Sequence, residues 1–285
     1  MKKYRPLFLL LAVVVWGCVS LLYPQISPTE GTLQVHYLDV GQADSILLQY
    51  GETDILIDGG NVADSSYVVS YLQKQGVEDL ELVVCSHAHE DHVGGLAGVL
   101  AVFPTAEVWS PTRTYSSKCF DDFLYYADQQ KLDIVIPQPG KKAVWEDLSL
   151  TVLGPVDSYS DTNNTSLVLL AQFGQNRFLF TGDMEKAAEN DLLDSGATVK
   201  ADVLKVGHHG SDTSTGYRFL REVAPSYAVI SVGEGNSYGH PHEEPLSRLR
   251  DAEVTVYRTD ELGAIVAESD GTNITFTWEK RKNGS

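Results

Sequence analysis

The sequence is poor in cations and contains no repeated or low-complexity segment. Only 21 Lys and Arg oppose 39 Asp and Glu, so the formal net charge is −18 at pH 7. A surface this acidic repels polyanions, which argues against tight, non-specific binding of nucleic acid. No basic stretch with interleaved aromatic residues marks a nucleic-acid groove either. The acidic balance suits a soluble surface outside the cell, and bound divalent cations would reverse its sign locally.

Cysteine is also scarce, and its spacing excludes two kinds of site. Cys18 lies in an apolar segment, Cys85 ends an apolar run, and Cys119 begins a helical stretch. Three cysteines at these separations form neither a disulfide framework nor a redox or zinc Cys pair. A single Cys85–Cys119 disulfide and two free thiols both stay open.

The N-terminus has the pattern of a membrane-inserting segment. Lys2, Lys3 and Arg5 precede the uncharged run Leu7–Tyr23, which is just long enough to span a bilayer. Because the cations come first, the positive-inside rule predicts that the rest of the chain is extracytoplasmic. A cleaved signal peptide, a retained membrane anchor and lipidation at Cys18 are the alternatives for this segment.

We expect one folded domain at residues 31–280, after a signal peptide or membrane anchor at residues 1–25. With 43% hydrophobic residues the chain can bury one large core. Hydrophobic periodicity predicts strands at 33–39, 45–50, 54–57, 80–85, 106–109, 133–136, 148–153, 167–173, 177–181, 202–206, 227–232, 253–257, 263–267 and 273–278. It predicts helices at 65–75, 95–102, 120–130, 184–193, 216–223 and 244–250. This alternation in two similar halves fits two mixed sheets packed face to face and flanked by helices, an α/β fold.

The chemistry of the chain centres on the stretch Cys85–Gly95. It holds His87, His89, Asp91 and His92 directly after an apolar run. A strand that ends in such a loop aims several ligands at one point. Imidazole nitrogen and carboxylate oxygen together suit Zn²⁺, Mn²⁺ or Fe²⁺. The stretch therefore predicts a metal site without deciding the metal.

The His-x-His-x-Asp-His pattern of residues 87–92 resembles that of the metallo-β-lactamase-fold hydrolases. Within this family, the chain from about residue 31 to 280 is similar to the C-terminal domain of the ComEC/Rec2 DNA-uptake proteins. The motifs that carry the closer resemblance are Leu38–Asp44, Leu56–Gly60, Asn164–Leu167, Phe180–Asp183 and Leu204–Ser211. The resemblance implies an αββα metallo-β-lactamase sandwich.

The resemblance also implies a ligand set for two divalent metal ions, zinc or manganese. It assigns His87 and His89 to the first ion, Asp91, His92 and His208 to the second, and Asp183 as a bridge between them. Two cations lower the pKa of a shared water toward neutrality and so supply hydroxide, which we expect to be the nucleophile. Asp91 would orient this water or take its proton.

Several of these assignments have structural alternatives. Asp183 precedes an expected helix and could be only its N-cap. Asp58 could be a turn residue, but we expect it to accept a hydrogen bond from a ligand imidazole. Asp44 is either a site residue or a turn residue. In an extended chain His208 and His209 would face opposite ways, so we assign His208 to the metal and His209 to catalysis, acting on the substrate.

Two further segments complete the predicted cleft. Asn164 stands where many relatives have a further His, which leaves the first metal short of a strong ligand and favours Mn²⁺ or a mononuclear site. His240 and His242 lie on a Gly/Pro turn. We expect these imidazoles to donate to a phosphate oxygen or to the leaving group, with His240 as a catalytic residue and His242 next to the site or on the substrate, although two exposed turn histidines are the alternative.

The predicted function is that of an extracytoplasmic, membrane-anchored or secreted metal-dependent hydrolase. A two-cation site suits in-line attack at phosphorus, so a phosphodiesterase or nuclease is the leading hypothesis, with nucleic acid as one candidate substrate. A lactone- or β-lactam-cleaving hydrolase and a non-catalytic domain that retains metal are the alternatives. The substrate, the metal, protein partners and the oligomeric state are not decided by the sequence.

Overall fold

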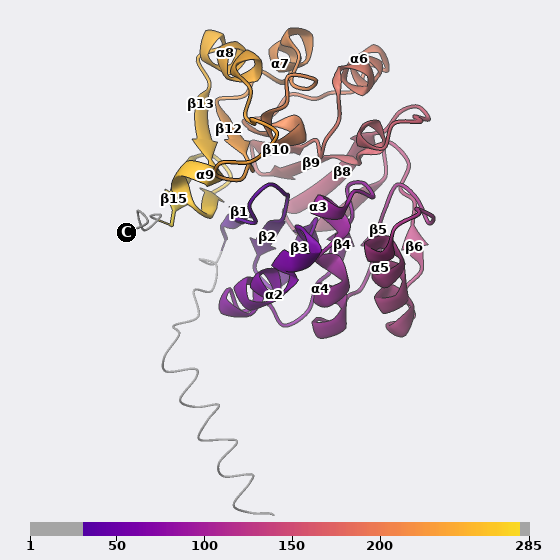
Figure 1. The fold of residues 1–285 in the computed structure, drawn as a ribbon. Coiled ribbons are helices and arrows are strands. Elements are labelled where there is room, and N and C mark those ends of the chain that lie inside the picture. Colours follow the sequence, from indigo (N-terminus) through magenta and orange to yellow (C-terminus); the bar gives the residue numbers. More distant parts are fainter. Residues whose placement is uncertain (1–30, 280–285) are drawn as a thin grey trace, which may run out of the picture.

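The computed structural model describes residues 31–279, which form two mixed β-sheets packed face to face (Figure 1). The first sheet has eight strands in the order β15 (Ile274–Trp278), β14 (Ile265–Ser269), β1 (Leu33–Tyr37), β2 (Ile46–Tyr50), β3 (Thr53–Ile57), β4 (Leu82–Val84), β5 (Val108–Trp109) and β6 (Ile134–Val135). The second has seven in the order β13 (Thr255–Arg258), β12 (Tyr227–Ile230), β11 (Val203–Lys205), β10 (Asn176–Phe180), β9 (Val168–Phe173), β8 (Leu148–Gly154) and β7 (Lys142–Trp145).

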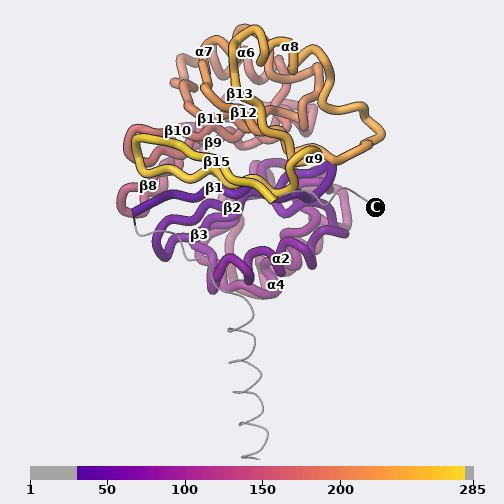
Figure 2. The backbone as a smooth tube through the Cα atoms, turned by 90° about the vertical axis from the view of Figure 1, so that its left-hand side faces the viewer, coloured from indigo at the N-terminus to yellow at the C-terminus, as the bar shows by residue number. Residues whose placement is uncertain are grey.

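Helices cover the outer face of each sheet, as Figures 1 and 2 show. The first sheet carries α2 (Ser65–Lys74), α4 (Leu96–Val102) and α5 (Lys118–Gln129). The second carries α6 (Lys186–Asp194), α7 (Tyr217–Val223) and α8 (Glu243–Asp251). Shorter helical turns are α3 (Glu90–Val93), α9 (Thr259–Leu262) and the 3₁₀ turns η1 (Val62–Asp64), η2 (Asn163–Thr165) and η3 (Gly207–Gly210).

Strand alternation explains this layering. In β3, Leu56 packs against the helices, whereas Ile55 and Ile57 face the second sheet. Successive side chains of a strand point to opposite faces, so an apolar strand buries residues in two layers at once. Three apolar layers result, one between the sheets and one under each set of helices. Full burial of each large side chain stabilises the fold by about 1.5–3 kcal/mol.

The sandwich expected from the sequence is confirmed, with limited corrections. Strand β7 and the helices α3 and α9 were not predicted. Cys85 and Cys119 are free thiols, so they form no disulfide. The predicted membrane segment at residues 1–25 lies outside the described residues. Within residues 31–279, no helix has the length and apolar character needed to cross a membrane.

The topology brings the ends of several strands together at one edge of the sandwich. Strand β3 runs parallel to β4, and β10 runs parallel to β11 and β12. Parallel neighbours end at the same edge of their sheet, so the loops after them lie close together. The backbone N–H of Leu167, which precedes β9, donates a 2.9 Å hydrogen bond to the Ser86 carbonyl, which follows β4. This bond joins the two halves where the polar loops meet.

Candidate metal centre

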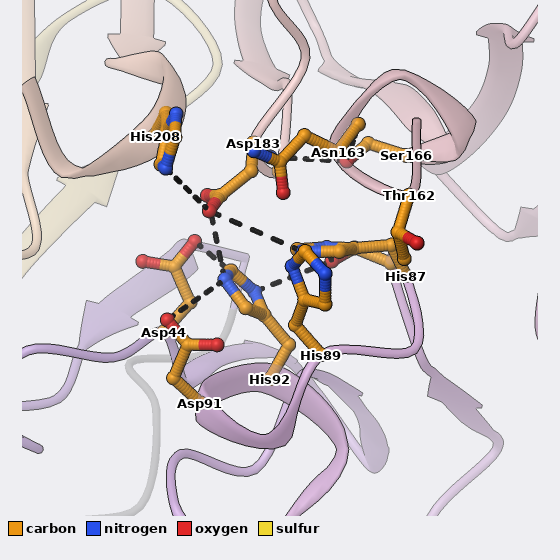
Figure 3. Close-up of polar contacts among 12 residues, drawn as sticks. Asp44, His87, His89, Asp91, His92, Thr162, Asn163, Ser166, Asp183 and His208 are labelled. Carbon is orange, nitrogen blue, oxygen red and sulfur yellow. Dashed lines mark hydrogen bonds and ion pairs between the residues drawn. The ribbon is translucent and has the colours of Figure 1, made fainter. Parts of the chain in front are cut away.

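Asp183, in the loop after β10, lies at the centre of a cluster of imidazoles (Figure 3). Its Oδ1 lies 3.3 Å from His92 Nε2. Its Oδ2 lies 3.7 Å from His208 Nε2, 3.6 Å from His209 Nε2 and 4.0 Å from His87 Nε2. The two oxygens thus face different imidazoles. Asp183 is not a helix N-cap, since α6 begins at Lys186 with Glu185 as its cap.

Four donors have the spacing needed to hold a metal ion. One ligand atom each from Asp91, His92, Asp183 and His209 lies within 4.8 Å of the other three. His92 Nε2, Asp183 Oδ1 and His209 Nε2 are buried and make no hydrogen bond. Leaving such atoms without a partner is costly, and one cation would satisfy all three. The donor set therefore fits the metal that the sequence predicts.

His87 and His89 lie beside these four donors, with the rings of His87 and His92 4.1 Å apart. Ser86 Oγ donates its proton to Asp58 Oδ2 at 2.6 Å, so His87 Nδ1, at 3.2 Å, must donate to Ser86 Oγ. His87 Nε2 then keeps a lone pair, 3.1 Å from His89 Nδ1. Burial, together with the neighbouring His92, lowers the pKa of His87 well below its usual value. A neutral imidazole with a free lone pair is the form that binds metal.

The cluster attracts positive charge. Burial alone would lower the pKa of His92, but Asp183, Asp91 and Asp58 outweigh burial and raise it well above the usual value. Burial would likewise raise the pKa of Asp183, but His209 and His92 outweigh it and lower the pKa well below the usual range. These opposite shifts show that the carboxylates favour cations at this point. A divalent ion would take the place of the protons on the imidazoles.

Asp58, at the end of β3, holds two neighbours of the cluster in place. His92 Nδ1 donates to Asp58 Oδ2 at 2.8 Å, and the Ser86 backbone N–H donates to Asp58 Oδ1 at 2.7 Å. The hydrogen bond expected from a ligand imidazole to Asp58 is therefore present. It directs His92 Nε2 at Asp183, where a bound metal ion would replace the proton on that nitrogen. Metal binding by His92 itself stays a prediction.

The glycines of two motifs let the loops after β3 and β4 interlock. A Cβ on Gly95 would lie 2.0 Å from the Gly59 carbonyl oxygen, and one on Gly59 would lie 2.6 Å from the backbone nitrogen of Leu96. The Gly59 N–H donates to the His92 carbonyl at 2.7 Å. Only glycine allows this approach, so the glycines after Asp58 and His92 fix both side chains relative to each other.

The structure changes the expectation for the His pair after β11. His208 and His209 have φ values of +51° and +52°, so the chain is not extended there. Both imidazoles consequently reach Asp183, and His209 rather than His208 belongs to the four-donor group. His209 Nδ1 donates to the Ser231 carbonyl at 2.9 Å, which directs Nε2 into the cluster. His208 lies nearer the surface, with 24% of its side chain exposed.

The asparagine turn η2 also differs from expectation. Asn163, rather than Asn164, lines the cleft, and its side-chain oxygen is buried without a hydrogen-bond partner. Asn164 Oδ1 instead accepts a hydrogen bond from the Glu185 backbone N–H at 3.1 Å. Ser166 Oγ accepts from the Asp183 N–H at 3.0 Å and so fixes the loop of the central carboxylate.

A cleft of about 560 Å³ opens above the cluster and is lined by His89, Asp91, Asp183, His208 and His209. His240 also lines it, and Gln42 Nε2 donates to His240 Nδ1 at 3.1 Å. His240 Nε2–H is then free to donate. Burial and the neighbouring His208 lower the pKa of His240 to about 4, so this ring is neutral at pH 7.

His242 does not take part in the cleft. Its Nδ1 accepts from the Asp212 N–H at 3.1 Å, and its Nε2 lies 3.2 Å from the Tyr238 carbonyl. Both ring nitrogens are therefore engaged in holding the loop. The ring of His242 therefore holds the loop around His240 and does not line the cleft.

Two residues near the cluster were not predicted as site residues. Gln42 lies in the motif Leu38–Asp44 and Lys205 in the motif Leu204–Ser211, but the sequence assigned neither a role. Lys205 is 1% exposed and forms an ion pair with Asp44, which is equally buried. Asp44 is therefore held in a buried ion pair beside the cluster, and its role as a site residue stays a prediction. A charged residue within an apolar strand was the available signal for Lys205, since buried charges require partners.

Comparison with known proteins agrees with this geometry. Residues 38–234 match the family model of the metallo-beta-lactamase superfamily. ComE operon protein 3 of Bacillus subtilis is 32% identical over 86% of this chain and 34% of its own length. Recombination protein 2 of Haemophilus influenzae is 33% identical over 86% of this chain and 30% of its own length. The chain thus spans about a third of these relatives.

Solved structures support the fold alone. The metallo-beta-lactamase fold protein YhfI from Bacillus subtilis superposes with a TM-score of 0.57 at 14% identity. The alignment covers 84% of this chain and all of that one. Identity this low carries no information on substrate.

Proposed function

The chain belongs to the metallo-β-lactamase superfamily, and on this premise we propose that it is an extracytoplasmic metal-dependent phosphodiesterase of the nuclease type. Within the superfamily it falls in the branch of the ComEC/Rec2 competence proteins. The fold is that of metal-dependent hydrolases, and the donor groups around Asp183 supply candidate metal ligands. Reaction type, substrate and location are the parts that we propose.

The position of Asp183 is the single observation that carries this proposal. One oxygen faces His92, and the other faces His87, His208 and His209. A carboxylate whose two oxygens lie within 4.0 Å of four imidazoles suits one or two divalent cations, zinc or manganese. When bound, such a pair supplies a water nucleophile at neutral pH and positive charge for the phosphoryl oxygens, which suits in-line displacement.

The protein side chains would orient the reactants and move protons. Asp91 lines the cleft, where its carboxylate would orient the attacking water or take its proton. The neutral His240 would donate its Nε2–H to a phosphoryl oxygen or leaving group. Asn163 would donate or accept at the cleft wall.

The cleft favours a substrate with few charges. No Lys or Arg side chain lines it among the described residues, so a long polyanion finds no cationic contacts there. Tyr238, at 68% exposure, stands at the rim and offers a ring for stacking. The relatives are named for competence and recombination. These features support a strand end or a small phosphodiester as substrate, more than the middle of a duplex.

The test is an assay of the metal-loaded protein against competing substrate classes. Bis(p-nitrophenyl) phosphate, single-stranded DNA, a lactone and a β-lactam are each offered with Zn²⁺ and with Mn²⁺. Phosphodiester turnover that disappears in Asp183→Asn and His87→Ala, but persists in the matched surface variant Asp128→Asn, supports the proposal. Turnover of the lactone or β-lactam alone refutes it.

Location needs a separate experiment. The N-terminal cations and the apolar run Leu7–Tyr23 support export. Alkaline phosphatase fused to the C-terminus should be active in bacteria, and replacement of the apolar run by Ser/Gly repeats should abolish that activity. An inactive fusion together with an active cytoplasmic reporter fusion would contradict export.

A further inference from the structure

Lys205 places a permanent cation inside the metal centre. It ends β11, is 1% exposed, and forms an ion pair with Asp44 Oδ2. Its ammonium also donates to the Gly182 carbonyl at 3.3 Å, one residue before the central Asp183. A buried charge is tolerated only when paired and hydrogen-bonded. The ammonium therefore has a defined place beside the cluster and cannot move out to solvent.

Asp44 connects this cation to the imidazoles of the cluster. Its Oδ2 lies 3.7 Å from His92 Nδ1, and its Oδ1 lies 3.6 Å from His209 Nδ1. Asp44 Oδ1 makes no hydrogen bond and is buried. Asp44, Asp58 and His92 also have ligand atoms close enough together to hold a cation of their own. The Lys205 ammonium already lies against that group.

We propose that Lys205 acts as a built-in substitute for a metal ion beside Asp44, and so confines divalent cations to the donors around Asp183. The inference rests on the proposed function only in requiring that the Asp183 cluster binds metal. Asp91 and Asp183 belong to one group of possible metal-binding atoms, Asp44 and Asp58 belong to a neighbouring group that shares His92, and Lys205 neutralises Asp44. Divalent ions are then attracted by the negative charge of the carboxylates that Lys205 does not neutralise.

This role predicts effects of opposite sign for the two partners. Lys205→Met leaves Asp44 as an uncompensated anion, which attracts divalent ions, so metal affinity rises by about tenfold or more, or an additional ion binds. Asp44→Asn leaves the Lys205 cation uncompensated, so metal affinity falls by about tenfold or more. The double variant restores the charge balance and returns both affinity and stoichiometry close to wild type.

A purely structural ion pair predicts a different pattern. Both single variants would then disturb the site, and both would lower metal affinity. If Asp44 were itself a metal ligand, the double variant would stay as weak as Asp44→Asn. The charge-conserving variant Lys205→Arg separates charge from side-chain length, and we expect its metal affinity to remain near wild type if it folds.

The experiment measures metal binding by the full chain without substrate. Bound Zn²⁺ or Mn²⁺ is counted by elemental analysis after gel filtration, and affinity is measured by competition with a chromogenic chelator. Circular dichroism and thermal melts verify folding; Lys205→Met should melt about 10 °C lower than wild type because it leaves a buried charge unpaired. The double variant should recover most of this loss.

Opposite shifts in the single variants, with recovery in the double variant, support the inference. Parallel losses in both single variants, or no change in metal binding in either, overturn it. Should Lys205→Met fail to fold, Asp44→Asn and the double variant decide the matter, since recovery of affinity in the double variant is expected from charge balance alone. Phosphodiester hydrolysis is assayed separately, so a metal-binding protein without that activity refutes the proposed function and leaves this inference testable.

Discussion

His92, in α3, donates its Nδ1 proton to Asp58 Oδ2, directly after β3, over 2.8 Å, and both side chains are buried. This bond fixes the orientation of the His92 ring, so that Nε2 faces Asp183. Asp58 has a φ of +61°, a conformation that Asp and Asn tolerate better than most residues. The strained backbone conformation thus occurs at Asp58, whose carboxylate orients the His92 ring.

Asp58→Asn should therefore weaken metal binding without unfolding the protein. Asparagine keeps the left-handed backbone and most of the shape, but it loses the anionic acceptor for His92 and the Ser86 hydroxyl. Partners of ligand histidines typically contribute about 10–100-fold to metal affinity or activity. Chelator competition and phosphodiester assays measure the loss, and a thermal melt monitors folding. Unchanged metal affinity would show that His92 needs no such partner.

The two neighbouring histidines should contribute unequally. His209→Asn removes a donor from the four-donor group, whereas His208→Asn removes a ring that lies nearer the surface. Asparagine suits the positive φ of both positions, so the pair is matched for backbone effects. We expect His209→Asn to lower metal affinity about tenfold more than His208→Asn. Equal losses, or a larger loss for His208→Asn, would favour the assignment expected from the sequence.

Gly95→Ala should disrupt the interlocked loops. The new Cβ would lie 2.0 Å from a backbone oxygen, and backbone cannot rotate away as a side chain can. We expect a loss of about 3 kcal/mol in the free energy of unfolding, at the upper end for overpacking, together with weaker metal binding. Gly140→Ala is the control, because nothing lies within 4 Å of its position and only the positive φ penalises it. Urea unfolding compares the two, and similar losses would contradict the steric account.

His36, on β1, should make the fold sensitive to acid. Burial lowers the pKa of His36 from 6.5 to about 4. The unfolded chain therefore takes up a proton near pH 6.5, whereas the folded chain resists it until about pH 4. The contribution of His36 to the free energy of unfolding is thus fully present above pH 6.5 and is lost as the pH falls toward 4. The loss is about 2 kcal/mol by pH 5 and about 3 kcal/mol in total.

The variant His36→Gln isolates this contribution. Its amide can still accept a hydrogen bond from Tyr71, whose hydroxyl lies 3.1 Å from His36 Nδ1. The variant should be less stable than wild type at pH 7 but should lose less stability between pH 7 and pH 5. Urea unfolding at both pH values measures the difference. A pH dependence identical to that of wild type would show that other groups cause the acid sensitivity.

Much of the fold was accessible from the sequence because its strands are strongly apolar. The segments 33–39, 45–50 and 54–57 correspond to β1, β2 and β3 within a few residues. Strand β7 was missed because its residues alternate between exposed and half-buried, and only Ala143 and Trp145 pack toward the core. The helix α3 lies within the His motif, and its length of one turn gives no periodic signal.

The sequence by itself determined the layered fold and the neighbourhood of the site, since apolar periodicity sets strand faces and motif residues follow strand ends. Only the tertiary structure showed that His208 and His209 both approach Asp183 and that Asn163 rather than Asn164 lines the cleft, because contacts with distant loops set which side chain of a tight turn points inward. It also decided the partner of Lys205, because Asp44 precedes a strand of the other sheet. Which buried charges meet depends on how the two sheets pack, and no local pattern records that.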